Sequence, residues 1–307
     1  MKTGTLKPSV YFSFQPLNIM SSASIGYFGP YRLLNVVNTG QSSRLWQAYD
    51  DQNRKFVGIK TLLDQFARQK DQVQILKWEY DVASKFSHPK LIHIFEFGWY
   101  QKTPYLVMEW FSAPNLKMWI NRGYAQYCSH LPKLMPEMVE ALLYLHEQGW
   151  THRDVKPDNF LFKDDEGKMK LIDFALARRI AKGFGKLFAM KSKTQGTASY
   201  MSPEQIRGLP PDSLADIYSL GCSFYELLTT RLPFAGESMN DLLNKHLVTP
   251  PPPITQRNKN ITPEFAGILK MMLAKKPEDR PKSTAELLKM LQTVRIFRRP
   301  PTPGDVS

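Results

Sequence analysis

Hydrophobic and polar positions divide the chain into a first part with strand patterns and a second part with helix patterns. Short apolar runs bounded by turn residues predict strands over residues 31–37, 44–49, 56–62, 91–98 and 104–110. A helical spacing of apolar residues over 69–86 separates the third run from the fourth. Beyond Phe111 the helical pattern dominates and predicts helices over residues 134–148, 215–228, 238–247, 263–274 and 283–293. Thr262-Pro263 and the Ser283–Glu286 pair are typical starts for the last two helices. We therefore expect an α+β fold, with a small lobe of five strands and one helix before a mainly helical part.

Both ends of the chain lack a sustained period. Residues 1–30 are rich in Ser and aromatic residues, and we expect a loosely ordered arm that packs on the domain through Tyr11, Phe12 or Phe14. Residues 295–307 are rich in Arg and Pro, which predicts a disordered basic tail. The expected organisation is an arm, a first lobe, a second lobe and a tail, at residues 1–30, 31–110, 111–294 and 295–307.

Composition limits the class of protein. With 307 residues, 42% hydrophobic and 22% charged, the chain is typical of a globular protein. Cys128 and Cys222 give no disulfide framework, so we expect a reducing, cytoplasmic location. No apolar run approaches the roughly 18 residues of a membrane helix, and no secretory signal is expected.

The formal net charge is +13, which could indicate nucleic acid or an anionic surface as a partner. The charge is spread along the chain, and no nucleic-acid motif accompanies it. A solvated basic surface is therefore the favoured interpretation, and acidic peptide substrates or anionic surfaces stay open alternatives.

One polar stretch, residues 151–159, has the pattern of a catalytic loop. It follows a predicted helix that Gly149 is suited to end, and it precedes two short apolar segments joined by an acidic turn. This order of helix, loop and hairpin puts Asp154 on the loop, Asn159 five residues later and Asp173 across the hairpin. Three oxygen-bearing side chains could then converge on one hard cation and its phosphate ligand.

The stretch resembles the catalytic loop of eukaryotic-like protein kinases, His-Arg-Asp-x-x-x-x-Asn, with the Asp-Phe pair of that family at Asp173-Phe174. The resemblance covers residues 31–291, with motifs in matching order. The sequence Gly-Thr-Ala-x-Tyr-x-Ser-Pro-Glu-Gln at 196–205 is most similar to bacterial Ser/Thr kinases. It implies a two-lobed fold with ATP and Mg²⁺ as cofactors.

The resemblance also implies roles for the polar residues of this loop. Asp154 would accept or orient the proton of the substrate hydroxyl, and Lys156 would steady the charge on the transferring phosphate. Asn159 and Asp173 would hold Mg²⁺. Thr197 would bridge Asp154 and Lys156, which is a feature of Ser/Thr kinases.

A second set of residues would bind the nucleotide. Lys60 ends a strand that reads Val-Gly-Ile-Lys, and a lone strand lysine is usually a surface charge. Glu79, nine residues before His88-Pro89, stands where the family places the partner of this lysine. The resemblance implies contacts to adenine from the hinge residues Glu109 and Phe111, and from the apolar or small residues Val37, Leu45, Gly58, Met108 and Leu161.

Two motifs depart from the family pattern. The hairpin turn reads Asn38-x-Gly40-x-x-Ser43 in place of Gly-x-Gly-x-x-Gly, so only Gly40 remains. The added Cβ atoms hinder close approach, and we expect weaker ATP binding than is usual in the family. Ala175 stands where the family has Gly after Phe174, which predicts fewer flipped conformers and no loss of Mg²⁺ binding.

Residues 175–203 would form the activation segment. It carries six basic residues and no acidic residue: Arg178, Arg179, Lys182, Lys186, Lys191 and Lys193. It is either a solvated loop or, with Arg153, the binding site for a phosphorylated Ser192 or Thr194 that orders the segment. The resemblance further implies structural roles for a Glu204–Arg280 pair and for Asp216, which would brace the catalytic loop.

Together these features predict a protein Ser/Thr kinase that transfers the γ-phosphoryl group of ATP to protein hydroxyls and autophosphorylates its activation segment. The partner is a protein substrate with a Ser or Thr acceptor, and a dimer is one option for autophosphorylation in trans. The main alternative is a nucleotide-binding pseudokinase scaffold, because of the altered turn and Ala175. A nucleic-acid-associated module is disfavoured because the basic residues form no clustered motif.

Overall fold

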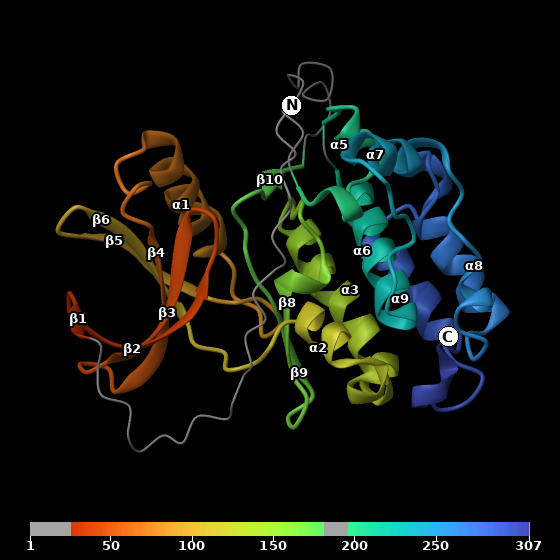
Figure 1. Cartoon of the computed structure of the whole chain (residues 1–307), viewed down its shortest axis with the longest axis horizontal. Coiled ribbons are helices and arrows are strands. Elements are labelled where there is room, and N and C mark those ends of the chain that lie inside the picture. The colour runs from red at the N-terminus through yellow and green to blue at the C-terminus, as the bar shows by residue number, and fades with distance from the viewer. Residues whose placement is uncertain (1–25, 181–195, 211, 307) are drawn as a thin grey trace.

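The structure is a computed structural model that describes residues 26–180, 196–210 and 212–306. Figure 1 shows two lobes, one built around a sheet and the other mainly helical. This is the α+β, two-lobed fold that the sequence predicts. Tyr11, Phe12 and Phe14, on which the expected packing of the arm depends, lie outside the described residues.

The first lobe is a six-stranded antiparallel sheet with one helix, α1 (Lys70–Ala83), against it. Its strands follow the order β1-β2-β3-β4-β6-β5. Their bounds are β1 Gly26–Phe28, β2 Tyr31–Thr39, β3 Ser43–Asp50, β4 Lys55–Leu62, β5 Ile94–Tyr100 and β6 Thr103–Glu109. Alternating residues of the sheet, including Leu33, Val57 and Ile59, form its buried cluster.

The sequence predicts five strands here, and the additional one is β1. It lies inside the predicted arm and pairs with the start of β2. The ring of Phe28 packs 4.7 Å from that of Tyr100 and 5.3 Å from that of Tyr105, measured between centroids. The predicted boundary at residue 30 is therefore wrong by a few residues, because three residues carry too short a pattern to be recognised as a strand.

Among the described residues, the second lobe contains the five predicted helices and two short ones that were not predicted, α2 and α5. The helix bounds are α2 Leu116–Arg122, α3 Leu131–Glu147, α5 Pro203–Ile206, α6 Ser213–Thr229, α7 Met239–Val248, α8 Pro263–Met272 and α9 Thr284–Thr293. Short strands pair as β8 (Phe160–Lys163) with β9 (Lys168–Leu171) and β7 (Trp150–Thr151) with β10 (Arg178–Arg179). The longer of these, α2, is capped by Asn115, whose side chain accepts a hydrogen bond from the Met118 N–H at 2.9 Å.

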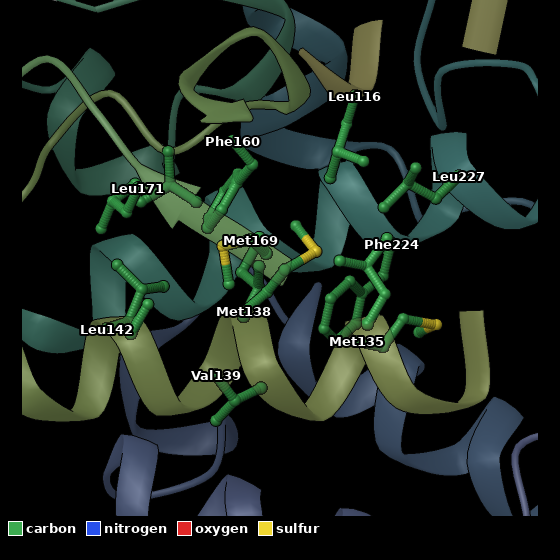
Figure 2. Close-up of a cluster of buried hydrophobic side chains, with 14 of the residues drawn as sticks. Leu116, Met135, Met138, Val139, Leu142, Phe160, Met169, Leu171, Phe224 and Leu227 are labelled. Carbon is green, nitrogen blue, oxygen red and sulfur yellow. The ribbon is translucent and has the colours of Figure 1, made fainter. Parts of the chain in front are cut away.

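Helix α3 lies at the centre of the second lobe and positions the loop that follows it. Figure 2 shows Met135, Met138 and Leu142 of this helix against residues of the β8–β9 hairpin and of α6. Gly149, just beyond the end of α3, has φ of 79° and turns the chain sharply toward residues 151–159. The loop therefore starts from a rigid, fully buried support.

The tail is packed, and the prediction of a disordered segment is wrong for residues 295–306. Ile296 and Phe297 are buried, and so is the carboxylate of Asp305. That carboxylate accepts hydrogen bonds from Asn260 Nδ2 at 2.8 Å and Thr302 N at 2.9 Å, and it pairs with Arg299 at 2.6 Å. Composition alone could not show this, because the partner Asn260 is 45 residues away in the sequence. Among the described residues, no helix is both long and apolar enough to cross a membrane.

Candidate active site

Lys60 of β4 lies between two carboxylates from different parts of the chain. Its Nζ is 2.7 Å from Glu79 Oε2 on α1 and 3.7 Å from Asp173 Oδ1, which follows the β8–β9 hairpin. Burial by itself would lower the pKa of Lys60, but the two carboxylates outweigh it and raise this pKa above its ordinary value. Burial likewise opposes ionisation of Asp173, and Lys60 still holds the pKa of Asp173 below its ordinary value. Lys60 and Asp173 are therefore charged at neutral pH, whereas burial raises the pKa of Glu79 above its ordinary value against the opposing effect of Lys60.

Asp216 of α6 holds the predicted catalytic loop, residues 151–159, in place. Its two carboxylate oxygens accept the backbone N–H groups of His152 and Arg153 at 2.7 and 2.8 Å. The ring of His146, at the end of α3, lies 2.8 Å from the same carboxylate. Arg153 has a φ of 69°, a conformation that costs free energy and is maintained by such surroundings. The bracing role predicted for Asp216 has its expected geometry, whereas the contact with His146 had no signal in the sequence.

Asp154, Lys156 and Thr197 form one compact hydrogen-bonded group. The N–H and hydroxyl of Thr197 donate to Asp154 Oδ1 at 2.9 and 3.0 Å. Lys156 Nζ lies 2.6 Å from Thr197 Oγ1 and 2.6 Å from Asp154 Oδ2. A carboxylate, an ammonium group and a hydroxyl thus meet at one point beside the loop. This arrangement can orient an acceptor hydroxyl and balance charge on a phosphate.

Asn159 and Asp173 are brought together by the hairpin between them. Phe160 pairs with Leu171 in the register of β8 and β9, and the Ile172 N–H donates to the Asn159 carbonyl at 2.9 Å. Ile172 therefore lies opposite Asn159, and Asp173 is the next residue along the chain. The Asn159 amide nitrogen donates to the Asp154 carbonyl at 2.8 Å, which leaves the amide oxygen free to act as an acceptor.

The model of the family described as "Protein kinase domain" matches residues 31–291. This chain belongs to the protein kinase family. It is 29% identical over 282 residues to the serine/threonine-protein kinase PknA of Mycobacterium tuberculosis, a match that covers 90% of this chain and 64% of PknA. It is 30% identical over 277 residues to the serine/threonine-protein kinase PknB of Mycolicibacterium smegmatis, covering 89% of this chain and 44% of PknB. The chain thus spans less than two thirds of the length of either relative.

The predicted adenine-binding residues of this kinase domain lie on both lobes. A Cβ atom added to Gly58 would lie 3.0 Å from Met108 Cγ and 3.6 Å from Leu45 Cδ1, so these three residues are in direct contact. Val37 lies on β2 and Leu161 on β8, and both are partly exposed. The absence of a Cβ atom at Gly58 lets the side chains of Met108 and Leu45 lie close to its backbone.

Glu109 and Phe111 are the predicted hinge residues of the kinase domain. The Glu109 carboxylate is 2.8 Å from Nζ of Lys170 on β9. The backbone N–H of Glu109 donates to the His93 carbonyl at 2.8 Å. The ion pair links the end of β6 to the second lobe across 61 residues of sequence, and no spacing signal could have predicted it. The ion pair restricts movement of the hinge relative to the second lobe.

The β2–β3 turn is tight despite its altered sequence. The Gly40 N–H donates to the Ser43 carbonyl at 2.8 Å. A Cβ atom at Gly40 would meet that carbonyl at an ordinary 3.6 Å, so the protein itself does not require glycine there. Asn38, Ser43 and Ala175 have no positive φ within the described residues, and their side chains cause no backbone strain in this conformation.

The fit of the site to Mg²⁺ depends on phosphate. Within the described residues, no three His, Cys, Asp or Glu side chains gather closely enough to hold a metal ion. Asn159 and Asp173 supply only two oxygen-bearing side chains. Mg²⁺ typically takes one or two protein ligands and completes its shell with water and phosphate oxygens, so the residues present fit this ion together with a nucleotide.

The activation segment is described only at its two ends. Arg178 donates to the Ala177 carbonyl at 2.8 Å, and burial followed by the charge of Arg178 lowers the pKa of Arg153. The residues predicted to bind or carry a phosphate lie outside the described part: Lys182, Lys186, Lys191, Ser192, Lys193 and Thr194. Past the segment, Arg280 donates two hydrogen bonds to the buried Glu204 at 2.7 and 2.9 Å, as the sequence predicts.

Proposed function

We propose that this protein is a serine/threonine-protein kinase that transfers the γ-phosphoryl group of ATP to Ser or Thr hydroxyls of proteins. The observation that carries the proposal is that both Lys156 and Thr197 contact Asp154. Asn159 lies five residues later on the same loop, and Asp173 follows the β8–β9 hairpin. The Lys60–Glu79 pair, with its 2.7 Å contact, completes the set from the first lobe. Family membership supports the reaction class, and the named relatives are both serine/threonine-protein kinases.

In this mechanism the residues of the catalytic loop act on the acceptor side. Asp154 orients the substrate hydroxyl and accepts its proton as the oxygen attacks the γ-phosphorus. Thr197 fixes one carboxylate oxygen of Asp154 through two hydrogen bonds, and the other oxygen lies 2.6 Å from Lys156 Nζ. Lys156, in contact with both, stabilises negative charge on the transferring group.

The nucleotide side is the task of residues from both lobes. Lys60 anchors the phosphates, and Glu79 keeps its ammonium group extended toward Asp173. Asn159 and Asp173 would hold Mg²⁺, which when bound neutralises the phosphate oxygens. Val37, Gly40, Leu45 and Leu161 would contact the nucleotide by their positions on the β2–β3 hairpin and β8.

A pseudokinase scaffold is the second candidate, because the turn keeps only Gly40 and residue 175 is Ala. Against it stands the complete polar set, since Lys60, Glu79, Asp154, Asn159 and Asp173 each have the partners that catalysis needs. A purely binding protein would have no use for the Lys156–Asp154 contact at 2.6 Å.

Radiolabelled ATP with a generic basic acceptor protein tests the proposal. Wild type should transfer phosphate, and Asp154→Asn should reduce transfer by at least about 100-fold, since it removes the base and its charge. Asp165→Asn, the same change on the exposed β8–β9 turn, serves as the matched control and should act like wild type. Equal incorporation by wild type and Asp154→Asn would reject the enzyme and leave the scaffold.

Autophosphorylation is part of this proposal. Mass spectrometry before and after incubation with ATP would find new phosphate on Ser or Thr of residues 181–195, and phosphate only on Tyr would contradict the specificity. A rate per molecule that rises with protein concentration would indicate transfer between two copies that meet in solution, and a constant rate would reject transfer between freely diffusing copies.

A further inference from the structure

Trp78 is the residue immediately before Glu79 on α1, and its side chain extends from the first lobe to the second. The indole Nε1–H donates to the Ala177 carbonyl at 3.0 Å, between residues 99 positions apart. Among the described residues, this is the hydrogen bond that connects α1 with the second lobe. The Ala177 carbonyl belongs to the segment that follows Asp173, so the bond links α1 directly to the metal-binding end of the proposed active site.

The indole also contacts two further side chains of the second lobe, those of Trp150 and Arg178. The Trp78 ring lies 5.9 Å from that of Trp150 on β7, in an edge arrangement. The guanidinium of Arg178 on β10 lies 5.1 Å from the Trp78 centroid, and the same Arg178 donates to the Ala177 carbonyl at 2.8 Å. Edge-to-face ring pairs and cation–π contacts are both attractive. One side chain of α1 is therefore held by two separate segments of the second lobe, residues 177–178 and β7.

The position of Trp78 on the helix couples this contact to Glu79. Successive residues of an α-helix point about 100° apart, so Glu79 faces Lys60 while Trp78 faces the second lobe. A rotation or outward shift of α1 that withdrew Glu79 from Lys60 would break the hydrogen bond of Trp78 as well. The two contacts therefore form and break together, because a helix moves as a rigid element.

We propose that Trp78 is a positioning residue, which ties α1 to the segment after Asp173 and so keeps Glu79 on Lys60. The inference rests on the proposed kinase function. Through its contacts with Ala177 and Arg178, the indole of Trp78 contributes to the ordering of α1. The rival interpretation is that Trp78 only fills space between the lobes, and the two differ in what the loss of the N–H alone should do.

Trp78→Phe tests the inference, because it keeps an aromatic ring and removes the hydrogen-bond donor. Trp99→Phe, at an exposed tryptophan of β5 in the same lobe, is the matched control. Loss of one neutral hydrogen bond from the active arrangement should reduce kcat/KM by about 3- to 10-fold. The thermal midpoint should stay close to that of the control, which shows that the variant is folded.

A double-mutant cycle with Glu79→Gln separates positioning from packing. If Trp78 acts through Glu79, adding Trp78→Phe to Glu79→Gln should reduce kcat/KM by less than about 2-fold. If Trp78 only packs, the same fold-loss should appear in both backgrounds. Equal losses in the two backgrounds would overturn the inference.

Hydrogen exchange of the backbone amides in α1 gives a readout that requires no activity. In Trp78→Phe these amides should exchange about 3- to 10-fold faster than in Trp99→Phe, because α1 opens more often. Equal exchange in the two variants would refute the role of Trp78. Asp154→Asn run beside wild type tests the kinase function separately, so the two failures cannot be confused.

Discussion

Acidification should destabilise the second lobe through His246, a fully buried residue of α7. The ring has polar, aromatic and cationic neighbours. The Tyr218 hydroxyl is hydrogen-bonded to Nδ1 at 3.0 Å, and the ring of Phe234 lies 4.9 Å away between centroids. Burial, followed by the positive charge of Lys275, lowers the pKa of His246 from its ordinary 6.5 to about 4. A proton on this ring would be placed in an apolar site beside another cation.

The sign of the effect follows from the two pKa values. In the unfolded chain His246 takes up a proton near pH 6.5, and in the folded protein only near pH 4. Between these values the unfolded state binds more protons, so the free energy of unfolding falls as pH falls. The contribution is complete above pH 6.5 and lost by pH 4. The gap is 2.5 pH units at about 1.36 kcal/mol each, which amounts to about 3 kcal/mol in order of magnitude.

Urea denaturation followed by circular dichroism, at pH 7.5 and 4.5, measures this loss. Wild type should lose about 2 to 3 kcal/mol more than His246→Gln, whose side chain can accept the hydrogen bond of Tyr218 and does not titrate. The readout is the change with pH, so a constant cost of the substitution does not matter. His130→Gln, at a partly exposed histidine just before α3, controls for removal of a histidine as such. The same pH dependence in wild type and His246→Gln would refute the reasoning.

Three further outcomes are expected from the buried ion pair, the β2–β3 turn and the loop brace. Arg280→Met should destabilise the second lobe by about 3 to 5 kcal/mol, because it leaves the buried Glu204 carboxylate uncompensated; thermal unfolding measures it, and little change would contradict it. Asn38→Gly with Ser43→Gly should lower the KM for ATP by allowing closer approach to the phosphates, and an unchanged or higher KM would refute that. Asp216→Asn should reduce kcat by about 10-fold or more, because one of its two backbone N–H partners then faces an amide group that donates; steady-state kinetics with an intact melting profile would check it.

Local features of the chain could be predicted from the sequence because they depend on neighbours in the sequence. Ser283 caps α9 by accepting from the Glu286 N–H at 3.1 Å, and Thr262 does the same for α8 at 3.2 Å. Asp154, Lys156 and Asn159 lie within six residues of one loop, so their spacing alone keeps them together. The periodicity of α3 predicted which face is buried, since burial of one face is what produces the period.

Contacts between distant segments were decided only by the tertiary structure. The sequence gives no sign that the Trp78 indole meets the Ala177 carbonyl, nor that Asp305 turns a basic tail into a packed one. Asp305 and Trp78 each carry a polar group that water could satisfy equally well in an unfolded segment. A hydrophobic pattern reports that a side chain is buried, but which partner buries it depends on how the lobes close around it. This is why the sequence by itself determined the elements and the chemistry of the loop, and the fold determined which groups hold that chemistry in place.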